Sequence, residues 1–189
     1  QDPSPCSFGP TSPTSPARMS QPPSKPELFS LVQIQHLMRV EFGRAQRYEY
    51  PMGCLMIQVD RLPQLRDLHG FEGKEAVISA VVEEIGKQTR GSDLLGSMPD
   101  DRLLLVLPHV PSANAVVVGQ RLLESVRERS VPVGEAELRV TLSLGAGWSD
   151  GGETMFFDAL LECADGALKA AVEEGGDRME LRIPGTEGS

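Results

Sequence analysis

The chain has few of the features that mark disulfide-rich or metal-binding proteins. Its 189 residues include three cysteines, Cys6, Cys54 and Cys163, which are widely spaced and form no CxxC pair. An odd number at such spacing makes no disulfide framework, and Cys54 and Cys163 stand in apolar surroundings, so we expect buried, reduced thiols. The three histidines are scattered. No ligand pair has zinc spacing, so we expect no metal site and no cofactor.

Long apolar runs and an excess of basic charge are also missing. No run approaches the roughly 18–20 apolar residues that span a bilayer, and the first residues lack the basic and apolar regions of a signal peptide. We therefore expect a cytoplasmic protein without membrane insertion. The net charge is −9. Nucleic-acid polymers and anionic membranes require a broad basic field, so neither is expected as a partner, although a few local arginines can still hold a small anion.

The two ends of the chain differ from its middle in composition. Residues 1–26 are rich in Pro, Ser, Thr and Gln, with almost no large hydrophobic residue after Phe8. Such a segment cannot bury enough apolar surface to offset its chain entropy, so we predict a disordered linker. Residues 184–189 are predicted to be a flexible tail. We expect the linker to tether the folded part, residues 27–183, to a fused domain or to a protein partner.

Within the folded part, apolar residues recur with helical spacing in some segments and form short continuous runs in others. The helical spacing predicts helices over residues 28–48, about 72–87, 112–129 and about 154–174. The short runs predict strands over residues 52–59, 93–97, 103–107, 138–148 and 179–183, with a hairpin turn at Pro99-Asp100. Strands that alternate with helices predict an α/β sandwich with a mixed central sheet of about five strands flanked by helices.

Five motifs occur along the chain in a distinctive order. They are Leu55-Met56-Ile57-Gln58-Val59-Asp60, Leu68-His69-Gly70-Phe71, the hairpin at 93–108, Val140-Thr141-Leu142-Ser143-Leu144-Gly145 and Ala164-Asp165-Gly166-Ala167-Leu168. In this order the chain from about Leu28 to Ile183 resembles the GGDEF domains of diguanylate cyclases, which have an Asp-x-Asp strand end, a Tyr-Gly-His motif, a signature hairpin, a TxSxG strand and an AD-x-AL helix. The resemblance implies a nucleotide-cyclase-like sandwich and a role in bacterial second-messenger signalling.

The resemblance also implies where a cyclase would hold its metal ions, and this chain departs from the family there. Joining two GTP molecules requires Mg²⁺ held by carboxylates. Gln58 stands at one of the family's metal positions, and the signature itself reads Pro99-Asp100-Asp101-Arg102-Leu103. Only Asp101 of the signature is retained. Pro99 and Asp100 replace two glycines whose backbone must approach the substrate closely.

The substrate-binding positions implied by the resemblance are changed as well. Pro63 and Val172 stand where the family has phosphate-binding lysines, and Arg66 and Glu75 stand where it has guanine-reading Asn and Asp. Loss of one charged transition-state contact reduces a rate by ~10²–10³. Because several such contacts are changed together, we predict a degenerate domain without cyclase activity.

One set of family ligand positions is retained. Arg90-Gly91-Ser92-Asp93 precedes the hairpin at the offset of the family's Arg-x-x-Asp motif, which forms an inhibitory product site for cyclic di-GMP, and Arg121 matches a third family ligand. Arginine pairs bidentately with phosphate or with guanine O6/N7, and a carboxylate accepts hydrogen bonds from guanine N1–H and N2–H₂. We therefore predict a regulatory cyclic di-GMP receptor that binds through Arg90, Asp93 and Arg121, with ligand-dependent homodimerisation as a secondary expectation.

Two other functions remain open from the sequence. The first is a scaffold domain that binds a protein partner independently of any nucleotide. The second is a GTP-binding regulator that uses the changed active site, although Pro63, Arg66 and Val172 argue against it.

Overall fold

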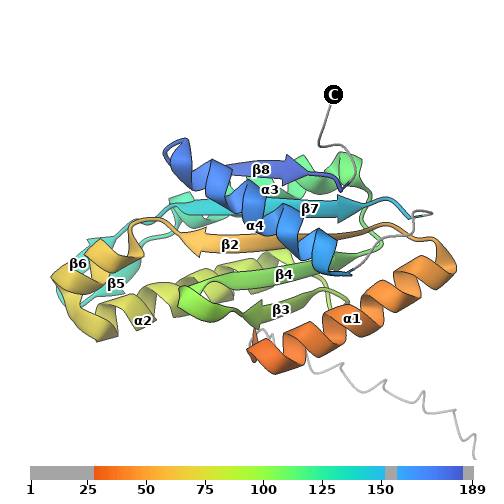
Figure 1. The fold of residues 1–189 in the computed structure, drawn as a ribbon. Helices are drawn as coiled ribbons and strands as arrows, with labels where there is room; N and C mark the ends of the chain where they lie inside the picture. The colour runs from red at the N-terminus through yellow and green to blue at the C-terminus, as the bar shows by residue number, and fades with distance from the viewer. Residues whose placement is uncertain (1–27, 152–156, 185–189) are drawn as a thin grey trace, which may run out of the picture.

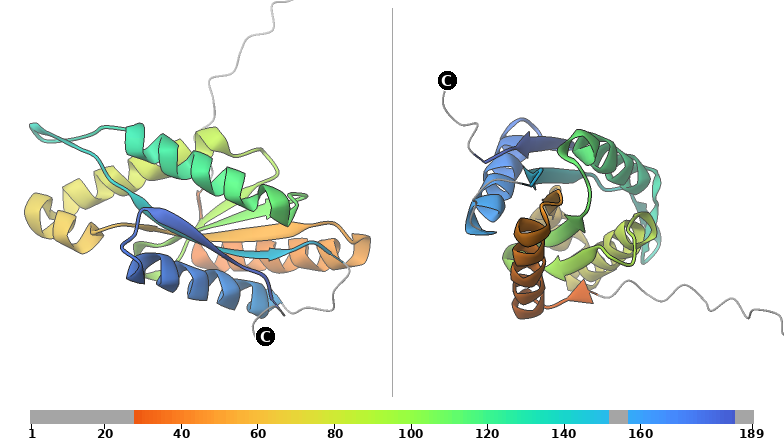
Figure 2. Two further views of the ribbon diagram at one scale, coloured as in Figure 1. Left: turned by 90° about the horizontal axis from the view of Figure 1, so that it is seen from above. Right: turned by 90° about the vertical axis from the view of Figure 1, so that its right-hand side faces the viewer.

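A computed structural model describes residues 28–151 and 157–184. The described chain is an α/β sandwich, as predicted, with helices α1 (Leu31–Tyr48) and α4 (Phe157–Glu173) on one face of a sheet and α2 (Leu62–Gln88) and α3 (Ala115–Glu128) on the other (Figures 1 and 2). Six strands form the mixed sheet in the order β1-β3-β4-β2-β7-β8. Their bounds are Leu28–Phe29 for β1, Leu94–Ser97 for β3, Leu103–Pro108 for β4, Met52–Val59 for β2, Leu142–Ser149 for β7 and Arg178–Arg182 for β8.

Three predictions fall wholly or largely outside the described residues. They are the linker at 1–26, the start of the last helix near residue 154 and the tail at 184–189, of which residue 184 alone is described. Within the described ranges, none of the helices combines the length and apolar character that a bilayer crossing requires.

The sheet separates two hydrophobic layers, because successive side chains of a strand point to opposite faces. On β2, Leu55 and Ile57 pack against α2 and α3, whereas Cys54 and Met56 pack against α1 and α4. All four are at most 3% exposed. Burying such a side chain contributes roughly 1.5–3 kcal/mol, so the two layers supply most of the driving force for the fold.

The N-terminal helix begins later than predicted. Leu28 and Phe29 form the short edge strand β1, which pairs in parallel with β3, and α1 starts after Ser30. Ser30 and Gln33 form a capping box, in which each side chain accepts a hydrogen bond from the backbone of the other residue. This strand brings the sheet to six strands instead of about five.

The second helix begins ten residues earlier than predicted, at Leu62 instead of residue 72. Pro63 lies in its first turn, where the missing N–H is harmless. The apolar pattern of the first part is weak because Leu68 is 80% exposed, and the helix is interrupted at Gly70, whose φ is 73°. Positive φ is a conformation that glycine adopts without strain.

The strand predicted over 138–148 is divided in the structure, because residue 138 ends one strand and residues 142–148 belong to another. Residues Val131–Val133 (β5) and Ala136–Leu138 (β6) form a small antiparallel hairpin of their own, and β7 starts only at Leu142. The predicted hairpin is confirmed, because β3 and β4 pair antiparallel from Leu94 with Val106 to Ser97 with Leu103.

Packing of α4 on β7 depends on two glycines. A Cβ at Gly145 would collide with the backbone of Ala164 and Leu168, and a Cβ at Gly147 would collide with the backbone of Leu160. The cysteine prediction holds for Cys54, which is buried in this layer and whose pKa burial raises to about 12. The prediction is wrong for Cys163, because this residue of α4 is only partly buried.

Candidate functional site

The structure brings the three predicted ligand residues to one cavity. Arg90 follows the end of α2, Asp93 immediately precedes β3, and Arg121 lies on α3. All three line a cavity of about 310 Å³ between these elements. Arg90 and Arg121, which are 31 positions apart in sequence, therefore line the same cavity.

The loop from Arg90 to Asp93 is closed by two reciprocal hydrogen bonds. The backbone N–H of Arg90 donates to Asp93 Oδ2 over 2.7 Å, and the backbone N–H of Asp93 donates to the Arg90 carbonyl over 3.0 Å. The other carboxylate oxygen, Asp93 Oδ1, is buried and has no hydrogen-bond partner in the described chain. Burial raises the pKa of the Asp93 carboxyl, although the Arg90 N–H, the Ser92 hydroxyl and the charges of Arg90 and Arg121 oppose the shift. A buried acceptor without a partner is costly, which favours a donor supplied from outside.

The two arginines differ in how firmly they are held. Arg121 Nη2 donates to the Gln88 carbonyl over 3.0 Å, which ties it to the last turn of α2. The guanidinium of Arg90 makes no hydrogen bond or ion pair with another residue of 28–151 and 157–184, and Arg90 is exposed. Arg90 can therefore turn toward a ligand without first breaking an internal contact.

Sequence reasoning missed the apolar part of this cavity. The lining includes Leu107 and Leu122 from the core side and Val117 from α3. Val117 is 60% exposed and lies four residues before Arg121, so both side chains stand on the same face of the helix. The spacing of four residues between Val117 and Arg121 was the sequence signal that could have placed an apolar side chain in the cavity. The result is an apolar wall beside two cations and a carboxylate, which suits a flat base that carries nearby phosphate.

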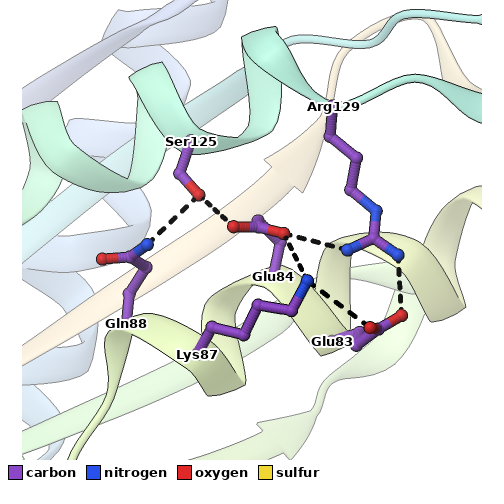
Figure 3. Close-up of polar contacts among 6 residues, drawn as sticks. All are labelled: Glu83, Glu84, Lys87, Gln88, Ser125 and Arg129. Atoms are coloured by element: carbon purple, nitrogen blue, oxygen red, sulfur yellow. Dashed lines mark hydrogen bonds and ion pairs between the residues drawn. The ribbon is translucent and has the colours of Figure 1, made fainter.

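A polar network joins α2 to α3 next to this cavity (Figure 3). Glu84 accepts from the Ser125 hydroxyl and pairs with Arg129 over 2.9 Å and with Lys87 over 3.2 Å. Glu83 pairs with the other terminal nitrogen of Arg129 over 2.6 Å. These contacts link the helices that carry the two halves of the Arg90–Asp93–Arg121 cavity.

The charge state of this network is well defined. Burial alone would raise the pKa of the Glu84 carboxyl, but the hydrogen bonds from Ser125, Arg129 and Lys87 outweigh it and lower the pKa to about 2. The carboxylate is therefore ionised at any physiological pH. Gln88 connects the network to the cavity, because its side chain donates to Ser125 and its carbonyl accepts from Arg121.

The signature turn lies at the other end of β3. Residues Pro99–Asp101 form one turn of 3₁₀ type, with positive φ of 61° at Asp100 and 59° at Asp101. Lys74 Nζ pairs with Asp101 over 2.7 Å, and Arg102 pairs with Asp165 over 2.6 Å. The role of Lys74 was missed from the sequence, because helical spacing does not show which side chain faces a distant turn.

The residues at the family's metal positions do not fit Mg²⁺. Gln58 supplies no charge, and the Asp101 carboxylate is already paired with Lys74. Asp60 accepts hydrogen bonds from the Thr141 and Ser143 hydroxyls, each over 2.6 Å, and from the backbone N–H of Asp177 over 3.0 Å. Mg²⁺ needs carboxylate oxygens that can enter an octahedral shell. Among the residues that the structure describes, no cluster of three or more metal-ligating side chains is found.

The changed substrate positions also lack the features of a phosphate site. Pro63 has no side-chain donor, and Val172 exposes an apolar side chain to the extent of 40%. Arg66 is exposed and pairs with Asp67 over 3.3 Å. Apart from Arg66, these positions offer no cationic side chain to a triphosphate, and the loss of substrate binding stays a prediction.

Comparison with known proteins places these features in context. The sequence profile described as "Diguanylate cyclase, GGDEF domain" matches residues 27–178. Diguanylate cyclase A of Treponema denticola is 25% identical over 153 residues, covering 81% of this chain and 40% of that protein. Diguanylate cyclase DosC of Escherichia coli is 24% identical over 146 residues, covering 77% of this chain and 31% of that protein. The chain thus spans less than half the length of these curated relatives.

Solved structures agree with the fold. Diguanylate cyclase SiaD of Pseudomonas aeruginosa, solved in complex with its activator SiaC, superposes with a TM-score of 0.75 at 28% identity, covering 85% of this chain and 62% of that one. The coiled coil and GGDEF domain of DgcB of Caulobacter crescentus, solved in complex with c-di-GMP, superposes with a TM-score of 0.76 at 16% identity, with 82% of each chain covered.

Proposed function

This chain belongs to the GGDEF domain family of diguanylate cyclases, and from that membership we propose that it is a catalytically inactive GGDEF domain that acts as a receptor for cyclic di-GMP. The ligand binds through Arg90, Asp93 and Arg121. One observation carries the proposal: the three side chains line one cavity in which Asp93 Oδ1 is buried without a partner.

The chemistry of the cavity suits the ligand. Cyclic di-GMP carries two phosphodiester charges and two guanines. Arg90 and Arg121 can pair with phosphate or with guanine O6/N7 and can stack on a base. Guanine N1–H and N2–H₂ would supply the donors that Asp93 Oδ1 lacks. The exposed Val117 adds an apolar surface for the base. Binding at about 1 μM requires about 8 kcal/mol, which a few charge-assisted hydrogen bonds and stacking can provide.

Loss of cyclase activity is supported by the opposite end of β3. There Lys74 neutralises Asp101, Asp165 holds Arg102, and hydroxyl groups occupy both oxygens of Asp60. Phosphoryl transfer depends on metal ions and charged groups placed around the phosphates. A chain that directs these side chains toward one another should not turn over GTP.

The proposal is tested by titration calorimetry of cyclic di-GMP into the full chain. We expect low-micromolar binding that Arg90→Ala weakens at least about tenfold, because each charge-assisted hydrogen bond is worth about 1.5–3 kcal/mol. Arg47→Ala is the matched control, since Arg47 on α1 is also exposed and has no ion pair with a described residue. GTP with Mg²⁺ should give neither binding of similar strength nor a cyclic product.

Two results would contradict the proposal. Binding that is equal in Arg90→Ala and wild type would place the ligand elsewhere. No binding of either nucleotide would favour the second candidate, a scaffold domain that binds a protein independently of cyclic di-GMP. Sedimentation of the liganded chain would separately test whether the ligand brings two copies together.

A further inference from the structure

A second surface of the molecule combines an apolar floor with exposed cations. It is a groove of about 810 Å³ at the end of the sheet where β2 ends and β8 begins, on the left of Figure 1. Its apolar lining consists of Leu65, Leu68, Leu138, Val140 and Val172. Leu68 is 80% exposed and Val172 is 40% exposed. Apolar side chains gathered in a solvent-facing hollow with a polar rim are typical of an interaction site.

The acidic side chains of this groove are engaged within the chain. Asp60 accepts three hydrogen bonds, from Thr141, Ser143 and the backbone of Asp177. The carboxylate of Asp177 pairs with Arg127 over 2.7 Å. Arg127 therefore balances the charge of Asp177, whereas Asp60 keeps its negative charge but has both carboxylate oxygens occupied by hydrogen bonds.

The basic side chains of the groove are not engaged. Arg61 and Arg139 both line it and are both exposed, and neither has a hydrogen bond or ion pair with a residue of the described ranges through its guanidinium. Because Arg61 and Arg139 together outweigh the single charge of Asp60, the groove is locally positive in a chain of net charge −9. Positive charge beside apolar surface selects a ligand that carries both carboxylates and apolar groups.

We propose that this groove docks a segment of a partner protein in which one or two apolar side chains are flanked by Asp or Glu. The apolar side chains would cover Leu68 and Val172, and the carboxylates would pair with Arg61 and Arg139. The proposal does not depend on cyclic di-GMP, because the groove and the Arg90–Asp93–Arg121 cavity share no lining residue.

A nucleotide fits the groove less well than such a segment. Pro63 and Val172 stand where the resemblance implies phosphate-binding lysines, and Asp60 would stand beside any phosphate that entered the groove. The volume of about 810 Å³ also admits several side chains at once. A peptide with acidic and apolar side chains can pair with the arginines of the groove and also cover its apolar lining.

The test uses the full chain as bait for a phage-displayed library of short random peptides. We expect enrichment of sequences with an apolar residue between acidic ones, and the synthetic peptides should bind in fluorescence polarisation. Arg139→Glu and Leu68→Asp should each weaken binding at least about tenfold. The matched charge reversal Arg47→Glu on α1 should change it less than about twofold. All three replaced residues are exposed, so thermal melts should show each variant folded, and all should retain cyclic di-GMP affinity.

Several outcomes would overturn this proposal. One is the absence of an enriched acidic and apolar motif, and another is a peptide that binds Arg139→Glu as well as wild type. A dimer of the unliganded chain that Leu68→Asp dissociates would identify a second copy as the occupant. GTP binding that Arg139→Glu abolishes would identify a nucleotide site. In each case the cyclic di-GMP titration would still report separately on the Arg90–Asp93–Arg121 cavity.

Discussion

The two ends of β3 use their charged residues in opposite ways. At the signature turn, Asp101 is paired with Lys74, and Arg102 is paired with Asp165, which Lys169 also contacts over 2.7 Å. At the other end, the Arg90 guanidinium has no partner in the described chain and Asp93 Oδ1 is buried without one. At the signature turn both of these residues are paired within the chain, whereas at the other end one guanidinium and one buried carboxylate oxygen have no partner in the described chain.

This difference indicates at which end of β3 a ligand would gain more binding free energy. A ligand at the signature turn would have to break existing ion pairs before making its own, so its net gain would be small. A ligand at the Arg90–Asp93–Arg121 cavity would relieve a buried acceptor that already costs the fold about 1–3 kcal/mol. We therefore expect a ligand to bind more readily at the Arg90–Asp93–Arg121 cavity than at the signature turn.

The largest expected effect is on cyclic di-GMP affinity, and it is measured by replacing one arginine near each end of β3. Arg121→Ala should weaken cyclic di-GMP binding by about 10- to 100-fold, because a charged hydrogen-bond partner is lost at a partly desolvated site. Arg102→Ala removes the same charge at the signature turn and should change the affinity less than about twofold. Titration calorimetry of both variants measures the contrast. Equal losses would show that the two ends do not differ in the way proposed.

The next effect concerns the protonation of Asp93. Because burial raises the pKa of this carboxyl, acid pH converts it into a poorer acceptor for guanine N–H groups. The affinity of the wild type for cyclic di-GMP should fall as pH decreases through that raised pKa. Asp93→Asn should bind about tenfold more weakly at neutral pH, since its amide would face donors, and should lack this pH dependence. Calorimetry from neutral pH down through the usual range of an Asp carboxyl, about pH 7 to pH 4, distinguishes the two. A wild-type affinity that is constant over this range would contradict the role assigned to Asp93.

A smaller effect is expected from the network that joins α2 to α3. The pKa of Glu84 is lowered from 4.5 to about 2 in the folded chain, so its contribution to stability is present above about pH 4.5 and is lost as pH falls toward 2. Glu84→Gln should lower the free energy of unfolding by roughly 1–3 kcal/mol at pH 7. The difference from wild type should vanish near pH 2. Urea denaturation at pH 7, 4 and 2 tests the sign, and an equal difference at all three pH values would refute it.

The smallest effect is expected at the signature turn itself. Lys74 is largely buried, but its partner Asp101 is 42% exposed, so water can solvate the carboxylate once the pair is lost. Lys74→Met keeps the apolar stem and should cost less than about 1 kcal/mol of stability. Thermal melts measure this, and cyclic di-GMP affinity should be unchanged. A loss of several kcal/mol would mean that the pair holds the turn together.

Much of the fold could be predicted because its signals are local. The helical spacing of Val77, Val81 and Ile85 marked the buried face of α2, and the apolar run at 103–107 marked β4. The predictions failed where the determining contact is distant or the pattern is weak. β1 is only two residues long and owes its existence to pairing with β3, and the first part of α2 exposes Leu68 where a core residue would normally reveal a helix.

For the candidate site, too, some features could be predicted from the sequence and others required the tertiary structure. The sequence alone predicted Arg90, Asp93 and Arg121 as ligand residues and a degenerate signature, because motif identity and spacing are properties of the chain. Only the tertiary structure decided that these three residues meet in one cavity, that Lys74 neutralises Asp101 and that Arg61 and Arg139 stand unpaired beside Leu68. The physical reason is that ion pairing and burial depend on distances between side chains that are far apart in sequence, and the folded core sets those distances.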